Sequence, residues 1–149
     1  MKKLNILLIG GTKDASNITK HIKEKYDSYI LTTTTTEYGS KLAIESGSDD
    51  TIAKPLLKDE FITLIENNEF NLLIDATHPY ASHITQTTVS LSKLFSIDYI
   101  RFERPPSNLD NVDTSRVHEV TSLDEAGQLI ANEFTSGNVL HLAGANTME

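Results

Sequence analysis

The stretch Leu72-Leu-Ile-Asp-Ala-Thr-His-Pro-Tyr-Ala81 decides the fold class of this chain. Its first three residues are apolar, as in a buried strand, and they give way abruptly to polar and ring-bearing side chains. In an open α/β sheet, ligands bind at the carboxyl ends of the strands, which is where such a break falls. The stretch therefore predicts both a parallel strand and a site at its end.

Short apolar runs alternate with helical patterns around this stretch, which is typical of βαβ units rather than of a sandwich or a bundle. The predicted strands are residues 4–9, 28–33, 51–53, 71–75 and 99–102. The predicted helices are residues 12–26, 39–45, 58–67 and 79–95, the last with Pro79 in its first turn. We expect a Rossmann-like, doubly wound α/β fold whose parallel strands follow the order 3-2-1-4-5.

A second region begins after the polar stretch 107–115, which is typical of a linker. There we predict strands at 117–120 and 139–142 and a helix reaching residue 134, opened by a capping box of Ser122 and Glu125. Residues 144–147, Gly-Ala-Asn-Thr, are typical of a loop that opens a further helix. We therefore expect a Rossmann-like domain at 1–106 and, at 107–149, a linker with the beginning of a second, truncated α/β domain.

The composition excludes several classes of protein. The net charge is −8, with 21 acidic against 13 basic residues, whereas a nucleic-acid binder needs a basic face. The apolar runs are far shorter than the ~20 residues that cross a bilayer, so we expect no membrane partner. The chain has no cysteine, which excludes disulfides and thiolate chemistry, and we predict no metal site. A small-molecule ligand stays open, and the default compartment is the cytoplasm.

The sequence Ile9-Gly-Gly-Thr-Lys-Asp-Ala15 lies where the first strand meets the first helix. Glycines allow a tight turn and a close approach to a pyrophosphate, and the positive end of a helix favours an anion. Against the dinucleotide pattern G-x-G-x-x-G/A, the sequence matches at Gly10 and Ala15 but has Thr12 in place of the middle glycine. It indicates either a phosphate-binding loop or a tight turn without a ligand.

Hydroxyl side chains, Thr32 to Thr36, end the second strand, where a dinucleotide fold contacts the adenosine ribose. An NAD enzyme usually places a carboxylate there, whereas an NADP enzyme avoids one. Because Glu37 comes too late to serve, the pattern favours NADP over NAD. The alternative, which accounts for most of the run, is that threonine is a good strand former.

The polar end of the opening stretch allows two interpretations. Asp75 or Thr77 could cap the following helix. His78 could hydrogen-bond a ligand carboxylate or donate a proton near neutral pH, or it could be a surface ring packed on Pro79 or Tyr80. Because strands one and four are neighbours in the predicted order, we expect this segment to meet the glycine loop.

The sequence Arg101-Phe-Glu-Arg-Pro105 leaves the fifth strand at the same edge. The guanidinium groups of Arg101 and Arg104 suit carboxylates and phosphates, which they bind through paired donors. The alternative is a salt bridge with Glu103.

These motifs, at 9–15, 75–81 and 101–105, together resemble the precorrin-6A reductase family of cobalamin synthesis. The resemblance covers residue 4 to about residue 147, and residues 144–147 resemble the glycine loop of that family's second domain. It implies an oxidoreductase that transfers hydride from NADPH, or from NADH, to precorrin-6A or cobalt-precorrin-6A, a small-molecule corrinoid precursor. The alternative is a non-catalytic nucleotide-binding or regulatory module of the same architecture.

The resemblance also implies a role for each candidate residue. The residues that would bind the cofactor are Gly10, Gly11, Thr12, Thr33, Thr34 and Thr35. Thr77 and His78 would be the catalytic residues, in the cleft where the nicotinamide meets the macrocycle. Tyr80, Arg101 and Arg104 would bind the substrate. Members of the family are considerably longer, so we expect the substrate cleft of this chain to be half-formed.

Overall fold

The computed structural model describes residues 3–105, 113–134, 136–140 and 142. The chain divides into two compact units, Met1–Pro105 and Pro106–Glu149. In the described part of the chain, no helix is long and apolar enough to cross a membrane.

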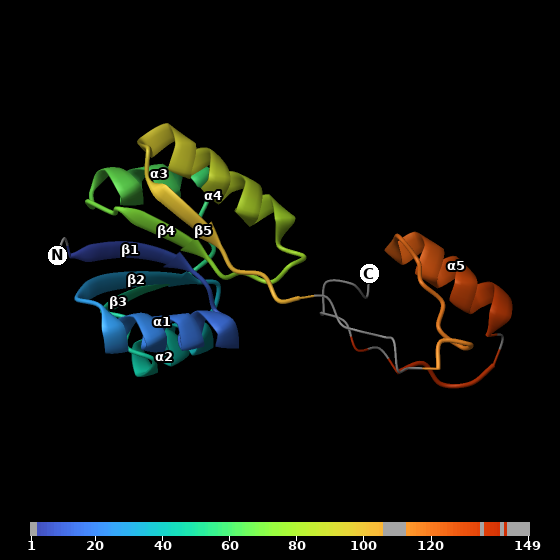
Figure 1. Cartoon of the computed structure of the whole chain (residues 1–149). Coiled ribbons are helices and arrows are strands. Elements are labelled where there is room, and N and C mark those ends of the chain that lie inside the picture. Colours follow the sequence, from blue (N-terminus) through green and yellow to red (C-terminus); the bar gives the residue numbers. More distant parts are fainter. Residues whose placement is uncertain (1–2, 106–112, 135, 141, 143–149) are drawn as a thin grey trace. The chain divides into compact units, whose positions relative to one another are not determined.

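The first unit is built on one sheet of five parallel strands (Figure 1). The strands are β1 (Leu4–Ile9), β2 (Ser28–Thr34), β3 (Asp50–Ala53), β4 (Leu72–Asp75) and β5 (Asp98–Arg101). Their order in the sheet is β3-β2-β1-β4-β5, which confirms the predicted order and the doubly wound fold. In the register, Ile9 at the end of β1 lies between Thr33 and Asp75, and Asp75 lies beside Arg101. The carboxyl ends of the central strands therefore form one edge.

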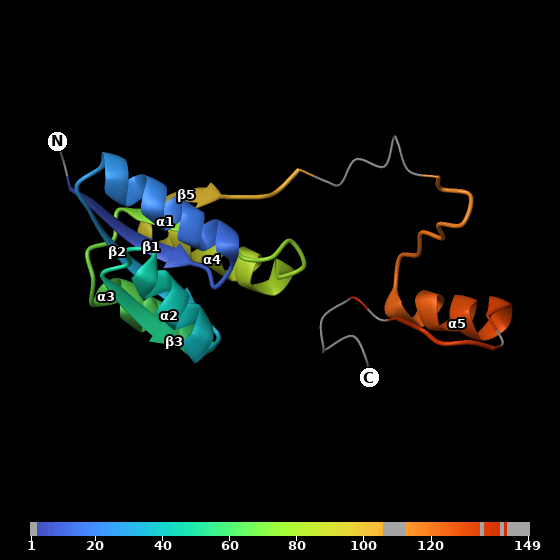
Figure 2. The ribbon, with the colours of Figure 1, turned by 90° about the horizontal axis from the view of Figure 1, so that it is seen from below.

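Helices cover both faces of this sheet. They are α1 (Lys13–Lys25), α2 (Glu37–Glu45), α3 (Lys58–Glu66) and α4 (Ser82–Phe95). Figures 1 and 2 show α1 and α2 on one face and α3 and α4 on the other. Strand β1 supplies both cores, since Leu7 packs with Phe61 and Leu91 whereas Leu8 packs with Ala15. A strand that is buried on both faces has to be apolar throughout, which explains its continuous apolar run.

The start of α4 differs from the prediction. The helix begins at Ser82, so Pro79 does not lie in its first turn. Pro79 instead occupies the second position of a turn in which the Ala81 amide donates to the His78 carbonyl at 2.9 Å. The fixed φ of proline suits this position as well as it suits a first helical turn, which explains the error. The N-cap residue is Ala81, which makes no side-chain cap bond, so the prediction that Asp75 or Thr77 caps the helix is wrong.

The second unit contains α5 (Leu123–Glu133), which begins as predicted after the N-cap Ser122. The Ser122 hydroxyl accepts from the Glu125 amide at 3.1 Å, but the Glu125 carboxylate accepts from the amide and hydroxyl of Thr121 instead of closing the box on Ser122. The predicted strands are not found at 117–120 or at the described residues of 139–142. A strand needs a partner backbone, and the described residues of this unit offer none. Residues 107–112 and the predicted loop 144–147 lie outside the described residues.

Candidate functional site

A cavity of about 420 Å³ opens at the carboxyl ends of β1, β2 and β4. It brings together eight of the predicted site residues: Gly10, Gly11, Thr12, Thr33, Thr34, Thr35, Thr77 and His78. The rest of its wall is formed by Ile9, Thr36, Lys54, Pro55, Leu56, Phe61, Ala81, His83 and Ile84, of which Pro55, Leu56, Phe61, His83 and Ile84 belong to none of the predicted motifs. The connections from β1 and β4 leave on opposite faces here, so the cavity lies at the topological switch point of the sheet.

The glycine loop forms one wall of the cavity. Gly11 has a φ of +102°, a backbone conformation that residues with a side chain rarely adopt. Gly10 allows α1 to lie close to β1, because a Cβ atom there would come within 2.6 Å of the Ala15 Cβ. Thr12, at the place of the expected middle glycine, caps α1 by accepting from the Ala15 amide at 3.2 Å. Its hydroxyl also donates to the Ala76 carbonyl at 3.0 Å, so the loops that follow β1 and β4 meet as expected.

The threonine run forms a second wall, and several of its hydroxyls bond within the fold. The Thr32 hydroxyl lies 2.7 Å from that of Ser48, and the Thr34 hydroxyl donates to the Thr36 carbonyl at 3.0 Å. Thr36 caps α2, where it accepts from the Gly39 amide at 3.1 Å. Thr32 to Thr34 therefore belong to the strand, as in the alternative that the sequence left open, and Thr36 serves as a helix cap that was not predicted.

The cavity lining is less acidic than the chain as a whole. None of the described residues that line it is Asp or Glu, although the chain carries a net charge of −8. Its basic side chains are Lys54, His78 and His83. The Lys54 ammonium lies 2.5 Å from the Glu60 carboxylate. Lys54 follows β3 at the same edge of the sheet, beside the end of β2.

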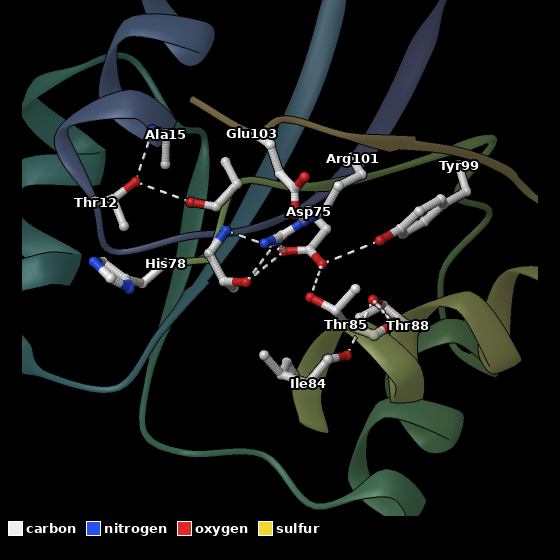
Figure 3. A network of polar contacts seen from close by, with 12 residues as sticks. Thr12, Ala15, Asp75, His78, Ile84, Thr85, Thr88, Tyr99, Arg101 and Glu103 are labelled. Atoms are coloured by element: carbon white, nitrogen blue, oxygen red, sulfur yellow. Dashed lines mark hydrogen bonds and ion pairs between the residues drawn. The ribbon is translucent and has the colours of Figure 1, made fainter. Parts of the chain in front are cut away.

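Asp75 ends β4 with a side chain that is 0% exposed. Its Oδ1 accepts from the Thr77 amide at 3.0 Å, from the Thr77 hydroxyl at 2.7 Å and from Arg101 Nη1 at 2.7 Å (Figure 3). Its Oδ2 accepts from the hydroxyls of Thr85 at 2.8 Å and Tyr99 at 3.1 Å. Burial alone would raise the pKa of this carboxyl, but the hydrogen bonds and the Arg101 charge outweigh burial and hold the pKa below its ordinary value of 3.8. Asp75 is therefore a charged group at neutral pH.

The three residues predicted to bind the substrate, Tyr80, Arg101 and Arg104, do not line the cavity. Arg101 forms the salt bridge with Glu103 that the sequence left as an alternative, at 3.2 Å, in addition to its bond with Asp75. Arg104 pairs with Asp14 at 2.7 Å. Tyr80 is 91% exposed, and its ring centre lies 5.0 Å from that of His78, as in the interpretation of His78 as a packed surface ring.

Protonation of Asp75 should destabilise the first unit. Because its pKa in the folded state lies below 3.8, the stabilisation is present above that pH and is lost as the pH falls through the folded pKa. Asp75→Asn should lower the free energy of unfolding by about 3 kcal/mol at neutral pH, since it leaves Arg101 without its buried partner. Urea denaturation across a pH series measures both effects.

The control is Asp14→Asn, which breaks the more exposed ion pair with Arg104. It should cost at most about 1 kcal/mol. A variant Asp75→Asn as stable as the unmodified protein at neutral pH would contradict the assignment of a stabilising ion pair.

Comparisons with known proteins agree with the motifs. The family model described as precorrin-6x reductase CbiJ/CobK matches residues 5–149. A cobalt-precorrin-6A reductase of Methanococcus maripaludis is 35% identical over 147 residues, which cover 98% of this chain and 56% of that protein. The chain spans about half the length of the curated relatives it matches.

Solved structures share the fold. A CobK precorrin-6A reductase superposes with a TM-score of 0.58 at 18% identity, over 72% of this chain and 42% of the other. A mycobacterial protein solved with NADPH superposes with a TM-score of 0.50 at 18% identity, over 73% of this chain and 35% of the other. Fold, motif order and the match over residues 5–149 agree, and the chain belongs to the precorrin-6x reductase family CbiJ/CobK.

Proposed function

We propose that this chain provides the NADPH-binding part of a reductase that acts on cobalt-precorrin-6A or precorrin-6A. The observation that carries the proposal is the cavity at the switch point, where the glycine loop, the threonine run and the segment after β4 meet. Membership of the reductase family supports a nicotinamide cofactor, and the described lining suits a dinucleotide because it has no carboxylate and carries apolar side chains such as Ile9, Leu56 and Phe61.

The pyrophosphate fits the glycine loop. The amino end of α1 presents the positive end of the helix dipole, and Gly11 keeps the approach open. Thr33, Thr34 and Thr35 would then lie along the adenosine end, as predicted. NADPH is preferred to NADH because the described wall carries no carboxylate for a ribose hydroxyl and does carry Lys54, which suits a 2′-phosphate.

The chemistry requires one hydride and one proton. NADPH supplies the hydride when bound. We propose His78 as the proton donor, in its imidazolium form, because its side chain lies on the cavity wall. Thr77 lies beside His78 on the cavity wall. The contacts of Tyr80 and Arg104 with the macrocycle stay predictions, and the exposed Tyr80 ring offers an apolar face to it.

NADPH binding should be saturable and should be weakened when Gly11 is replaced. Gly11→Asp forces a side chain into a left-handed conformation and places a negative charge beside the pyrophosphate, so the Kd should rise at least about tenfold. Cofactor fluorescence measures the affinity. Gly47→Asp is the matched control, because Gly47 has a φ of +105° but lies outside the cavity lining, and it should leave the Kd unchanged.

Lys54 should distinguish the two cofactors. Lys54→Gln should raise the Kd of NADPH about tenfold, as expected for the loss of one charge-assisted contact, and leave that of NADH nearly unchanged. Lys58→Gln, on the first residue of α3 and outside the cavity lining, is the control. Equal losses for both cofactors would contradict a 2′-phosphate contact.

Turnover tests the reductase itself. NADPH is mixed with cobalt-precorrin-6A or precorrin-6A and a version of the protein extended to the length of the Methanococcus maripaludis relative, while the cofactor absorbance is followed. We expect oxidation of NADPH that depends on the macrocycle. Binding of NADPH without turnover would support the alternative, a non-catalytic nucleotide-binding module.

A further inference from the structure

The two oxygens of the Asp75 carboxylate bond to different parts of the structure. Oδ1 accepts all three of its bonds from Thr77 and Arg101, and Thr77 lines the cavity. Oδ2 accepts from Thr85 on α4 and Tyr99 on β5, neither of which lines the cavity. One oxygen therefore bonds to Thr77, which lines the cavity, and the other joins α4 to the sheet (Figure 3).

The Arg101 guanidinium is already bonded to three side chains of this network. Its Nη1 donates both to Asp75 at 2.7 Å and to the Thr77 hydroxyl at 2.9 Å, and its Nε donates to Glu103 at 3.2 Å. Only 16% of its side chain is exposed. A substrate carboxylate would have to compete with a buried carboxylate already in contact, and separating that pair would leave Asp75 charged and uncompensated.

Thr77 is held through both its backbone and its side chain. Its amide and hydroxyl donate to Asp75, and the same hydroxyl accepts from Arg101. The preceding residue, Ala76, is fixed from the other side, because its amide donates to the Ile9 carbonyl at 2.9 Å and its carbonyl accepts from Thr12. The next residue along the chain is His78, at the cavity wall.

We propose that Asp75 and Arg101 are positioning residues, which hold Thr77 and His78 in place at the cavity before the cofactor binds. Holding the segment beforehand avoids the entropic cost of ordering it on binding. Arg101 thus acts through Thr77, and not by receiving a substrate carboxylate. The inference rests on the proposed function, since NADPH is the ligand whose binding reports the positioning.

A double-mutant cycle tests the proposal. Arg101→Gln removes the guanidinium, Thr77→Val removes the hydroxyl but keeps the shape, and a third protein carries both changes. Each single change should raise the Kd of NADPH about tenfold, and the double change should raise it no further, because both interrupt one chain of contacts. A roughly hundredfold, multiplicative loss would overturn the proposal by showing that Arg101 acts on the ligand separately. An unchanged Kd in Arg101→Gln would also overturn it.

Tyr99→Phe is the matched control, because it removes a bond to the other oxygen of the same carboxylate. It should lower the free energy of unfolding but leave the Kd of NADPH unchanged. A loss of affinity equal to that of Arg101→Gln would show a merely structural role for the network. Should Arg101→Gln not fold, Arg101→Lys keeps the charge but not the planar fork, and its Kd should still rise about threefold.

A measurement without ligand separates this inference from the proposed function. The Thr77 amide donates to Asp75, so its hydrogen exchange should be faster in Arg101→Gln than in the unmodified protein and unchanged in Tyr99→Phe. If NADPH fails to bind the unmodified protein, the proposed function fails, and the exchange rates alone decide the positioning role. Equal exchange in all three proteins would overturn it.

Discussion

A charged carboxylate with no exposed surface must be paired and hydrogen-bonded, and Asp75 imposes this requirement on the centre of the structure. Its donors come from the loop after β4, from α4 and from β5. Removing Arg101 would leave a buried charge uncompensated, and removing a hydroxyl donor would leave a buried oxygen short of a hydrogen bond. The positions of these elements at the carboxyl edge are therefore tied together. An apolar core alone would not specify them so narrowly, because hydrophobic contacts are not directional.

Thr12 extends this connection to the other half of the sheet. In the dinucleotide pattern the middle glycine lets the backbone approach a pyrophosphate. Thr12 has a side chain where that glycine would stand. Its hydroxyl caps α1 and donates to the Ala76 carbonyl, so one side chain holds both the loop after β1 and the loop after β4. The departure from the pattern is thus compensated within the same site, and the loops after β1 and β4 form one wall.

The fold could be predicted from the sequence to the extent that its signals are local. Apolar runs and helical periodicity predict the strands and the helices because each element carries its own pattern, and the order 3-2-1-4-5 is the usual order of the fold that their alternation indicates. The role of Asp75 could not be read this way, since Tyr99 and Arg101 are 24 and 26 residues away along the chain. From the sequence alone, a carboxylate that precedes a helix resembles an N-cap residue. Only the strand register shows that Asp75 lies beside Arg101. The prediction of strands in the second unit was wrong for a related reason, because a strand must pair with another strand elsewhere in the chain.

The electrostatics of the cavity follow from where the acidic groups are paired. Three of the carboxylates near its wall, along the chain or in space, are paired with a cation: Asp75 with Arg101, Asp14 with Arg104, and Glu60 with Lys54. Interactions beyond about 8 Å are largely screened at physiological salt, so the net charge of −8 matters less to a bound anion than these neighbours do. Asp14 lies in the first turn of α1, and its ion pair with Arg104 offsets its negative charge. The positive end of the helix dipole and the loop amides can then attract the anion. An acidic chain can in this way offer a site for a polyanionic cofactor without a basic surface.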